Sequence, residues 1–218
     1  MSKRVSFWQA NSLSLILSAI FVVCLGGQFL AGYRTWNEEL REHGQAPLTL
    51  GAYASSGHFV GATFENWESE FLQMGMYVLL TVWLRQRGSA ESRPLPGQPD
   101  EPRIDPGPTP WPVRAGGWWR KLYRVSLSTA LLTLFALSWL GHAWGSWHHA
   151  IDEQRLKGSP PPGFWEHVAS AQFWFESLQN WQSEFLAVLA LVLLSIVLRQ
   201  DNSPESKPLE APHAQTGG

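Results

Sequence analysis

Two segments decide the fold, because they repeat each other: residues 65–95 read ENWESEFLQMGMYVLLTVWLRQRGSAESRPL, and residues 179–209 read QNWQSEFLAVLALVLLSIVLRQDNSPESKPL. At this ungapped offset of 114, 17 of the 31 positions are identical. Each segment contains an uncharged run of 14 residues that ends at Arg-Gln. A run of that length suits a buried helix of a soluble protein as well as a membrane span, so the preceding residues are needed to decide.

A longer apolar run precedes each repeated segment. Residues 12–33 contain no charged side chain, and residues 126–147 contain none unless His142 is protonated. Each run has 22 residues, enough for a helix that rises ~1.5 Å per residue to cross a ~30 Å hydrocarbon core. The predicted fold class is an all-α membrane protein with four transmembrane helices, arranged as a tandem parallel repeat of a two-helix copy. The predicted spans cover about residues 12–33, 64–85, 125–147 and 178–199.

The repeat also predicts the domain organisation. Because each copy holds an even number of spans, both copies insert in the same orientation, related by an axis along the membrane normal. Residues 88–117 hold eight of the chain's 15 prolines, which predicts an extended or disordered cytoplasmic linker. The expected divisions are a first membrane copy at 1–87, this linker, a second membrane copy at 118–201 and a polar C-terminal tail at 202–218.

The Lys and Arg residues predict the orientation. Twelve of the 16 lie at the two ends and in the central connection, and four lie in the loops within the copies. Cytoplasmic segments carry the excess of Lys and Arg, so both ends are predicted to be cytoplasmic. Trp67 and Trp181 then lie at the outer interface, where Trp rings anchor helices. Each outer loop is expected to hold a short surface helix, at residues 50–61 and from Pro162 onward.

Several other classes are disfavoured. Lys3 and Arg4 before an apolar run also fit a cleaved signal peptide, but no small-x-small cleavage site follows and the run aligns with residues 126–147; we therefore expect it to be retained. A net charge of −2 without an extended basic stripe predicts no nucleic-acid partner. The single cysteine, Cys24, excludes an intramolecular disulfide and a dithiol redox site.

The segments FENWESEFLQMGMYVLLTVWLRQRGSAES and NWQSEFLAVLALVLLSIVLRQ resemble an uncharacterised family of short bacterial four-helix membrane proteins, a domain of unknown function with paired NW-x-SEF segments. The resemblance covers nearly the whole chain. It implies a multi-pass protein of the bacterial inner membrane, with the lipid bilayer as its surroundings. It carries over no activity and no catalytic residue.

The shared NW-x-SEF motif supplies the sharpest site candidates, which are Glu70 and Glu184 with Asn66 and Asn180. Glu70 precedes Arg85 by 15 residues, or ~22 Å along a helix, which places it inside the outer boundary of the core. A carboxylate at that depth is costly unless it is paired, protonated or facing water. One interpretation is a proton- or cation-binding pair in an outward-facing cavity; the other is helix capping or hydrogen bonding between the copies. Three other acids of the first copy face no acid in the second: Glu42, Glu65 and Glu68.

Small residues and histidines give further candidates. Small-xxx-small pairs allow the first and third spans to pack closely or to form a dimer face, and two are present: Gly27 with Ala31, and Gly141 with Gly145. His142 and His149 are candidates for a metal site, because a helix places them on one face with Glu153. The first copy has no histidine at the equivalent positions, so interfacial histidines without a ligand are the alternative.

Three classes of function follow from these candidates. The first is a non-enzymatic membrane protein whose Glu and Asn side chains stabilise the bundle or bind a small cation. The second is a small proton- or cation-coupled transporter, for which a homodimer is the expected assembly. The third is a membrane enzyme or metal-site protein that uses the histidines of the third span. The sequence contains no Gly-rich phosphate loop and no nucleophile elbow, and we expect no cofactor.

Overall fold

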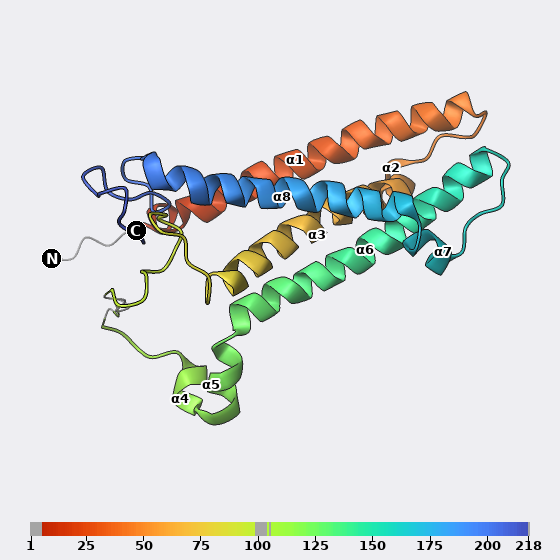
Figure 1. Ribbon diagram of the computed structural model, residues 1–218. Helices are drawn as coiled ribbons and strands as arrows, with labels where there is room; N and C mark the ends of the chain where they lie inside the picture. The colour runs from red at the N-terminus through yellow and green to blue at the C-terminus, as the bar shows by residue number, and fades with distance from the viewer. Residues whose placement is uncertain (1–5, 99–103, 105, 218) are drawn as a thin grey trace. The chain divides into compact units, whose positions relative to one another are not determined.

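The structure is a computed structural model that describes residues 6–98, 104 and 106–217, and within them every regular element is an α-helix (Figure 1). The helices are α1 (Phe7–Glu42), α2 (Leu50–Ala54), α3 (Gly57–Leu80), α4 (Trp111–Ala115), α5 (Gly117–Tyr123), α6 (Ser126–Leu156), α7 (Phe164–Val168) and α8 (Ala171–Val197). The chain forms two compact units. The first contains the residues up to Thr63 with Ala143–His167, and the second contains Phe64–His142 with the residues from Val168 onward.

Three helices are long and apolar enough to cross a membrane: α1, α6 and α8. They suggest a multi-pass membrane protein. The surface of α1 agrees with this, because large apolar side chains such as those of Leu13, Ile16 and Val23 are more than half exposed. Exposed apolar surface of this extent needs a cover, and a lipid bilayer supplies one.

The interior is polar. Among the described residues, five hydrophobic residues are buried against 15 polar or charged ones, including Glu68 and His142. A soluble protein buries its apolar side chains first. A polar interior under an apolar surface is the distribution expected where lipid is the solvent, because lipid tails are as apolar as leucine side chains.

Helix α3 differs from the predicted span. The sequence predicts a span over about residues 64–85, whereas α3 runs from Gly57 to Leu80 and is followed by a turn. Any 18-residue stretch of α3 contains Glu65, Glu68 and Glu70. This charge keeps α3 outside the group of helices that are apolar enough to cross a membrane by composition alone.

An aromatic core holds the first unit together. The buried ring of Tyr53 on α2 packs against Phe29 and Phe59, with ring centroids 5.3 and 5.6 Å apart. Asn37 of α1 ties down the following loop, because its side chain accepts a hydrogen bond from Leu48 N at 2.6 Å and donates one to Leu48 O at 3.2 Å. These contacts place α2 against α1.

Glycines allow the closest helix contacts. A Cβ on Gly145 of α6 would lie 2.6 Å from Gly61 Cα in the first unit, and a Cβ on Gly141 would lie 2.6 Å from the Phe64 ring in the second. The first span or a dimer partner was expected to contact Gly141 and Gly145; within the described residues both glycines contact α3, which brings its own Gly61 to the contact. A Cβ on Gly27 would meet no described atom within 4 Å, so Gly27 packs against no described helix.

The segments that follow α3 and α8 fold against each other in the second unit. Ser89 Oγ lies 2.9 Å from Ser195 Oγ, with Ser89 fully buried. Lys207 is 1% exposed, and five main-chain carbonyl oxygens lie within 3.5 Å of its Nζ, those of Gly88, Ile196, Pro212, His213 and Gln215. The first residues of the predicted linker, Gly88 and Ser89, therefore contact α8 and the segment that follows it, and their carbonyl and hydroxyl groups help to satisfy buried polar groups there.

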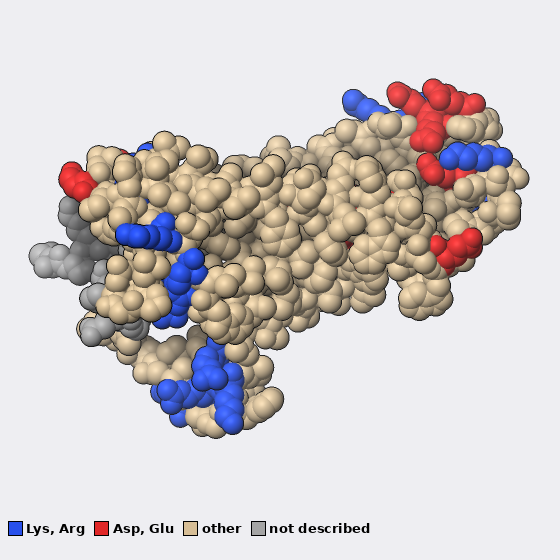
Figure 2. Space-filling view, in the orientation of Figure 1, with Lys and Arg blue, Asp and Glu red and all other residues tan. Residues whose placement is uncertain are grey.

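A basic surface precedes α6. Figure 2 shows Lys and Arg side chains gathered over α4 and α5, and the residues concerned are Arg114, Arg120, Lys121 and Arg124. Trp118 and Trp119 of α5 are 72% and 51% exposed. Exposed Trp next to Lys and Arg is typical of a segment at a membrane interface.

Candidate functional site

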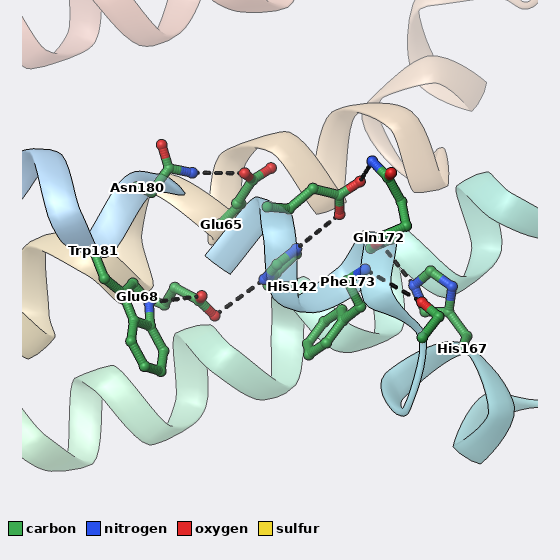
Figure 3. Close-up of polar contacts among 11 residues, drawn as sticks. Glu65, Glu68, His142, His167, Gln172, Phe173, Asn180 and Trp181 are labelled. Carbon is green, nitrogen blue, oxygen red and sulfur yellow. Dashed lines mark hydrogen bonds and ion pairs between the residues drawn. The ribbon is translucent and has the colours of Figure 1, made fainter. Parts of the chain in front are cut away.

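Among the described residues of the second unit, two ionisable side chains have no exposed surface: Glu68 of α3 and His142 of α6. Glu68 Oε2 lies 3.1 Å from His142 Nδ1. The other carboxylate oxygen, Oε1, accepts a hydrogen bond from Trp181 Nε1 of α8 at 3.1 Å (Figure 3). Both oxygens of Glu68 are thus engaged, and its carboxylate fixes the orientation of the imidazole ring.

Glu176 of α8 faces the other nitrogen of the same ring. Its Oε2 lies 3.6 Å from His142 Nε2, which is too long for a hydrogen bond, and its Oε1 accepts a hydrogen bond from Gln172 Nε2 at 2.8 Å. The ring of Phe173 stacks on the imidazole with centroids 4.8 Å apart. His142 Nε2 is therefore buried without a hydrogen-bond partner among the described residues.

Glu65 completes the group one turn before Glu68. It accepts a hydrogen bond from Asn180 Nδ2 at 2.6 Å (Figure 3). Glu65, His142 and Glu176 each offer one ligating atom, and these three atoms lie within 4.8 Å of one another. We call Glu65, Glu68, His142 and Glu176 the buried centre.

Helix periodicity explains how the sequence builds this centre. Glu65 and Glu68 stand at i and i+3 on α3, and Glu176 and Asn180 stand at i and i+4 on α8, so each pair lies on one helix face. Ser170 caps the start of α8, because its Oγ accepts a hydrogen bond from Phe173 N at 3.2 Å. The cap begins α8 two turns before the residues that contact α3.

The buried centre is rich in negative charge. It holds three carboxyl groups and one imidazole, so with its acids ionised it stays negative even when His142 is protonated. A buried charge is costly unless it is paired and hydrogen-bonded. A bound cation would offset this cost, and the centre offers both oxygen and nitrogen ligands for one.

The motif residues predicted from the sequence lie mostly outside the centre. Asn66 and Glu70 are exposed, whereas Asn180 and Glu184 are half-buried. Asn180 contacts the centre through Glu65. Glu70 follows Glu68 by two residues, which is about 200° around a helix. Its side chain consequently points away from the face that Glu68 occupies.

The two candidate histidines have different surroundings. His142 belongs to the buried centre, whereas His149 lies in the first unit, with its ring 5.0 Å from Trp36 and 5.1 Å from His58. The His58 ring stacks on Trp36 at 5.2 Å. Burial and the neighbouring His149 lower the pKa of His58 to about 4, against a smaller opposing effect of Glu153.

The predicted anchor residues Trp181 and Trp67 and the predicted packing residue Ala31 make contacts with neighbouring side chains or with the main chain. Trp181 donates to Glu68 instead of serving only as an interface anchor. The Trp67 ring packs edge-on against Phe64 with centroids 5.2 Å apart. Ala31 lies within α1, where its carbonyl accepts a hydrogen bond from Thr35 Oγ1 at 3.1 Å.

Three residues of the centre were missed by sequence reasoning: Glu65, Glu68 and Glu176. Each lacks an acid at the equivalent position of the other copy, where the chain has Gln179, Gln182 and Ala62. The available signals were the i, i+3 spacing of Glu65 and Glu68 and the presence of His142 within an otherwise uncharged run.

The comparisons with known proteins give one result. A family model described as Domain of unknown function (DUF6766) matches residues 4–218. No curated protein and no solved structure matches the chain.

Proposed function

This chain belongs to that family of unknown function, and we propose that it is a non-enzymatic, four-span protein of the bacterial inner membrane whose buried centre binds a small cation and moves it across the bilayer. The observation that carries the proposal is the 3.1 Å contact of Glu68 and His142, neither of which has exposed surface. Ionisable side chains inside a bilayer are costly, and they commonly mark ion pathways where they occur.

The helix boundaries support a tandem repeat. Helices α2 and α7 begin and end 114 residues apart, α1 and α6 end 114 residues apart, and α3 and α8 begin 114 residues apart. The ends of the long helices also correspond, because Arg85 donates to Thr81 O at 3.0 Å and Arg199 donates to Ser195 O at 3.4 Å. Each copy thus has two long helices joined by a short one.

Helix α3 is the proposed fourth span despite its charge. Glu65 and Glu68 belong to the buried centre and bond to side chains of α8, so their charges do not face lipid. Residues 71–84 carry no charge, and the exposed Glu70 then lies towards the outer interface. Four spans bring both ends to one side of the membrane, as the Lys and Arg distribution favours. The basic surface of α4 and α5 falls on the same, cytoplasmic side.

In this topology the centre lies within the membrane. His142 follows the first residue of α6, Ser126, by 16 residues, or ~24 Å along the helix axis. The hydrocarbon core is ~30 Å thick, so His142 lies in the outer part of the core when Ser126 marks the inner boundary. A cation entering from outside would reach the centre over a short path.

Flux of cations into proteoliposomes tests the proposal. His142→Gln and Glu68→Gln are suitable variants, because each introduces the residue that the other copy carries at the equivalent position (Gln28 and Gln182). Glu70→Gln is the matched control, since the Glu70 side chain is exposed. We expect uptake of a cation from a panel of Na⁺, K⁺, Mn²⁺ and Zn²⁺ by the wild type and by the control, and its loss in both centre variants.

Thermal stability recorded on the same samples separates transport from bundle stabilisation. A centre variant that stays folded and loses flux supports a transporter. Absence of flux in the wild type, together with a large loss of stability in His142→Gln, would overturn the transport proposal and leave the buried centre as a structural contact among three helices.

A further inference from the structure

We propose that the cation of the buried centre is a divalent first-row transition-metal ion, bound by Nε2 of His142 and by carboxylate oxygens of Glu65 and Glu176. This inference rests on the proposed function, because it names the cation that the same centre would take. The three ligands come from α3, α6 and α8, so the metal would join three helices at one point.

The spacing of the ligating atoms suits a metal ion better than a hydrogen bond. The atoms of Glu65, His142 and Glu176 all lie within 4.8 Å of one another, and His142 Nε2 lies 3.6 Å from Glu176 Oε2. Nitrogen and oxygen ligands at ~2.0–2.2 Å from a tetrahedral zinc are separated by about 3.4 Å. A metal placed between these two atoms therefore needs only a small adjustment of the side chains.

The hydrogen-bond pattern leaves one ring nitrogen for the metal. Glu68 Oε2 lies beside Nδ1 at 3.1 Å, so Nδ1 carries a hydrogen, and in the neutral imidazole Nε2 presents a lone pair. That lone pair is fully buried, without a hydrogen-bond partner among the described residues, and faces the carboxylate of Glu176. With a neutral imidazole these two atoms are both acceptors and repel each other; a metal ion between them removes the repulsion, as protonation of Nε2 also does.

Glu68 and Trp181 supply the outer support that such a ligand needs. Metal-binding histidines usually donate their other N–H to a carboxylate, which fixes the ring and makes it a stronger ligand. Glu68 occupies that position, and its second oxygen is held by Trp181 Nε1 at 3.1 Å. Asn180 holds the Glu65 carboxylate in the same way at 2.6 Å. Glu68 is thus a positioning residue of the site.

The donor set indicates the class of metal. Calcium and magnesium prefer oxygen ligands alone, and copper(I) prefers sulfur. One imidazole with two carboxylates suits Mn²⁺, Fe²⁺, Co²⁺ or Zn²⁺. Three protein ligands also leave a coordination position open, as in sites where the metal exchanges a water or a substrate. A metal ion with an open coordination position can exchange its ligands and be released, as transport requires.

Titration with Co²⁺ tests the inference, because bound Co²⁺ reports its ligand geometry in the visible spectrum. The sample is the full-length protein in lipid nanodiscs, with Zn²⁺ added afterwards as competitor. We expect one Co²⁺ per chain, displaced by Zn²⁺. His142→Gln removes the binding, Glu68→Gln weakens it about 10- to 100-fold, and Glu70→Gln leaves it unchanged.

X-ray absorption of the Zn²⁺-loaded wild type keeps the test independent of variant folding. We expect one imidazole nitrogen and carboxylate oxygens at about 2.0–2.2 Å and no sulfur. Failure of the wild type to bind Co²⁺ or Zn²⁺, or binding that is unchanged in a folded His142→Gln variant, overturns the metal inference; flux of another cation would then still support the proposed function. Stoichiometric binding without flux would support the metal site and contradict the transport role.

Discussion

The carboxylate of Glu68 and the imidazole of His142 lie 3.1 Å apart in a fully buried position, although 74 residues separate them in the sequence. Each side chain supplies the polar partner that the other would otherwise find in water. Because Glu68 also accepts the Trp181 N–H, the same carboxylate connects α3, α6 and α8. Its removal should therefore affect folding and binding together.

Replacing Glu68 by alanine is predicted to destabilise the protein strongly. The change leaves the buried donor of His142 and the partly buried donor of Trp181 without an acceptor, at a cost of about 1–3 kcal/mol for a buried group. Thermal unfolding in detergent measures the effect. Glu70→Ala changes an exposed carboxylate in the same helix and is expected to stay within about 0.5 kcal/mol of the wild type; equal losses in the two variants would contradict the assignment of Glu68.

The two predicted small-xxx-small pairs should respond differently to added volume. Gly145→Ala brings a Cβ to within 2.6 Å of Gly61 Cα, so the helices must separate and stability is expected to fall by about 1–3 kcal/mol. Gly27→Ala meets open space and is expected to be neutral or to stabilise by up to about 1 kcal/mol, because alanine favours a helix. Comparison of their unfolding midpoints checks this order. A loss at Gly27 as large as that at Gly145 would indicate that α1 packs on a second copy.

Protonation of His58 is predicted to weaken the first unit at low pH. The folded-state pKa is about 4 and the unfolded value is about 6.5, so between these values the unfolded chain binds more protons and stability rises with pH. The contribution is complete above pH ~6.5 and is lost as the pH falls towards ~4. Unfolding midpoints across this window should decline less steeply in His58→Gln than in the wild type, whereas parallel curves would refute the prediction.

Cysteine labelling distinguishes four spans from three. In a Cys24→Ser background, Gln45→Cys and Ser159→Cys lie in the loops between the long helices, and Gly107→Cys lies in the central connection. We expect a membrane-impermeant maleimide added to intact cells to label the first two sites and to reach Gly107→Cys only after permeabilisation. If α3 does not cross the membrane, the reagent will find Gln45→Cys and Gly107→Cys on the same side.

Much of the fold could be predicted because it depends on runs of residue types. The long uncharged runs at 12–33 and 126–147 predicted helices long and apolar enough to span a bilayer, and α1 and α6 contain them. Short helices in the outer loops were also expected, although α2 and α7 each have only five residues. Helix ends were less accurate, because they depend on local caps such as Ser170 Oγ at the start of α8.

The site could not be predicted by the same means, because it does not follow the repeat. Glu70 and Glu184 were favoured because both copies carry them, yet side-chain direction on α3 turns Glu70 away from the face of Glu68. The centre joins Glu68 of one proposed copy to His142 and Glu176 of the other, and at the positions 114 residues away the chain has Gln182, Gln28 and Ala62. A search for residues that both copies share therefore overlooks residues that occur in one copy and contact the other.

The most direct test of the central claim is an anomalous difference map from crystals of the wild-type protein grown with Zn²⁺ in lipid. The buried centre predicts one strong peak within about 2.2 Å of His142 Nε2 and of carboxylate oxygens of Glu65 and Glu176. A map without a peak there, at full occupancy of the protein and in excess Zn²⁺, would contradict a transition-metal site in the buried centre.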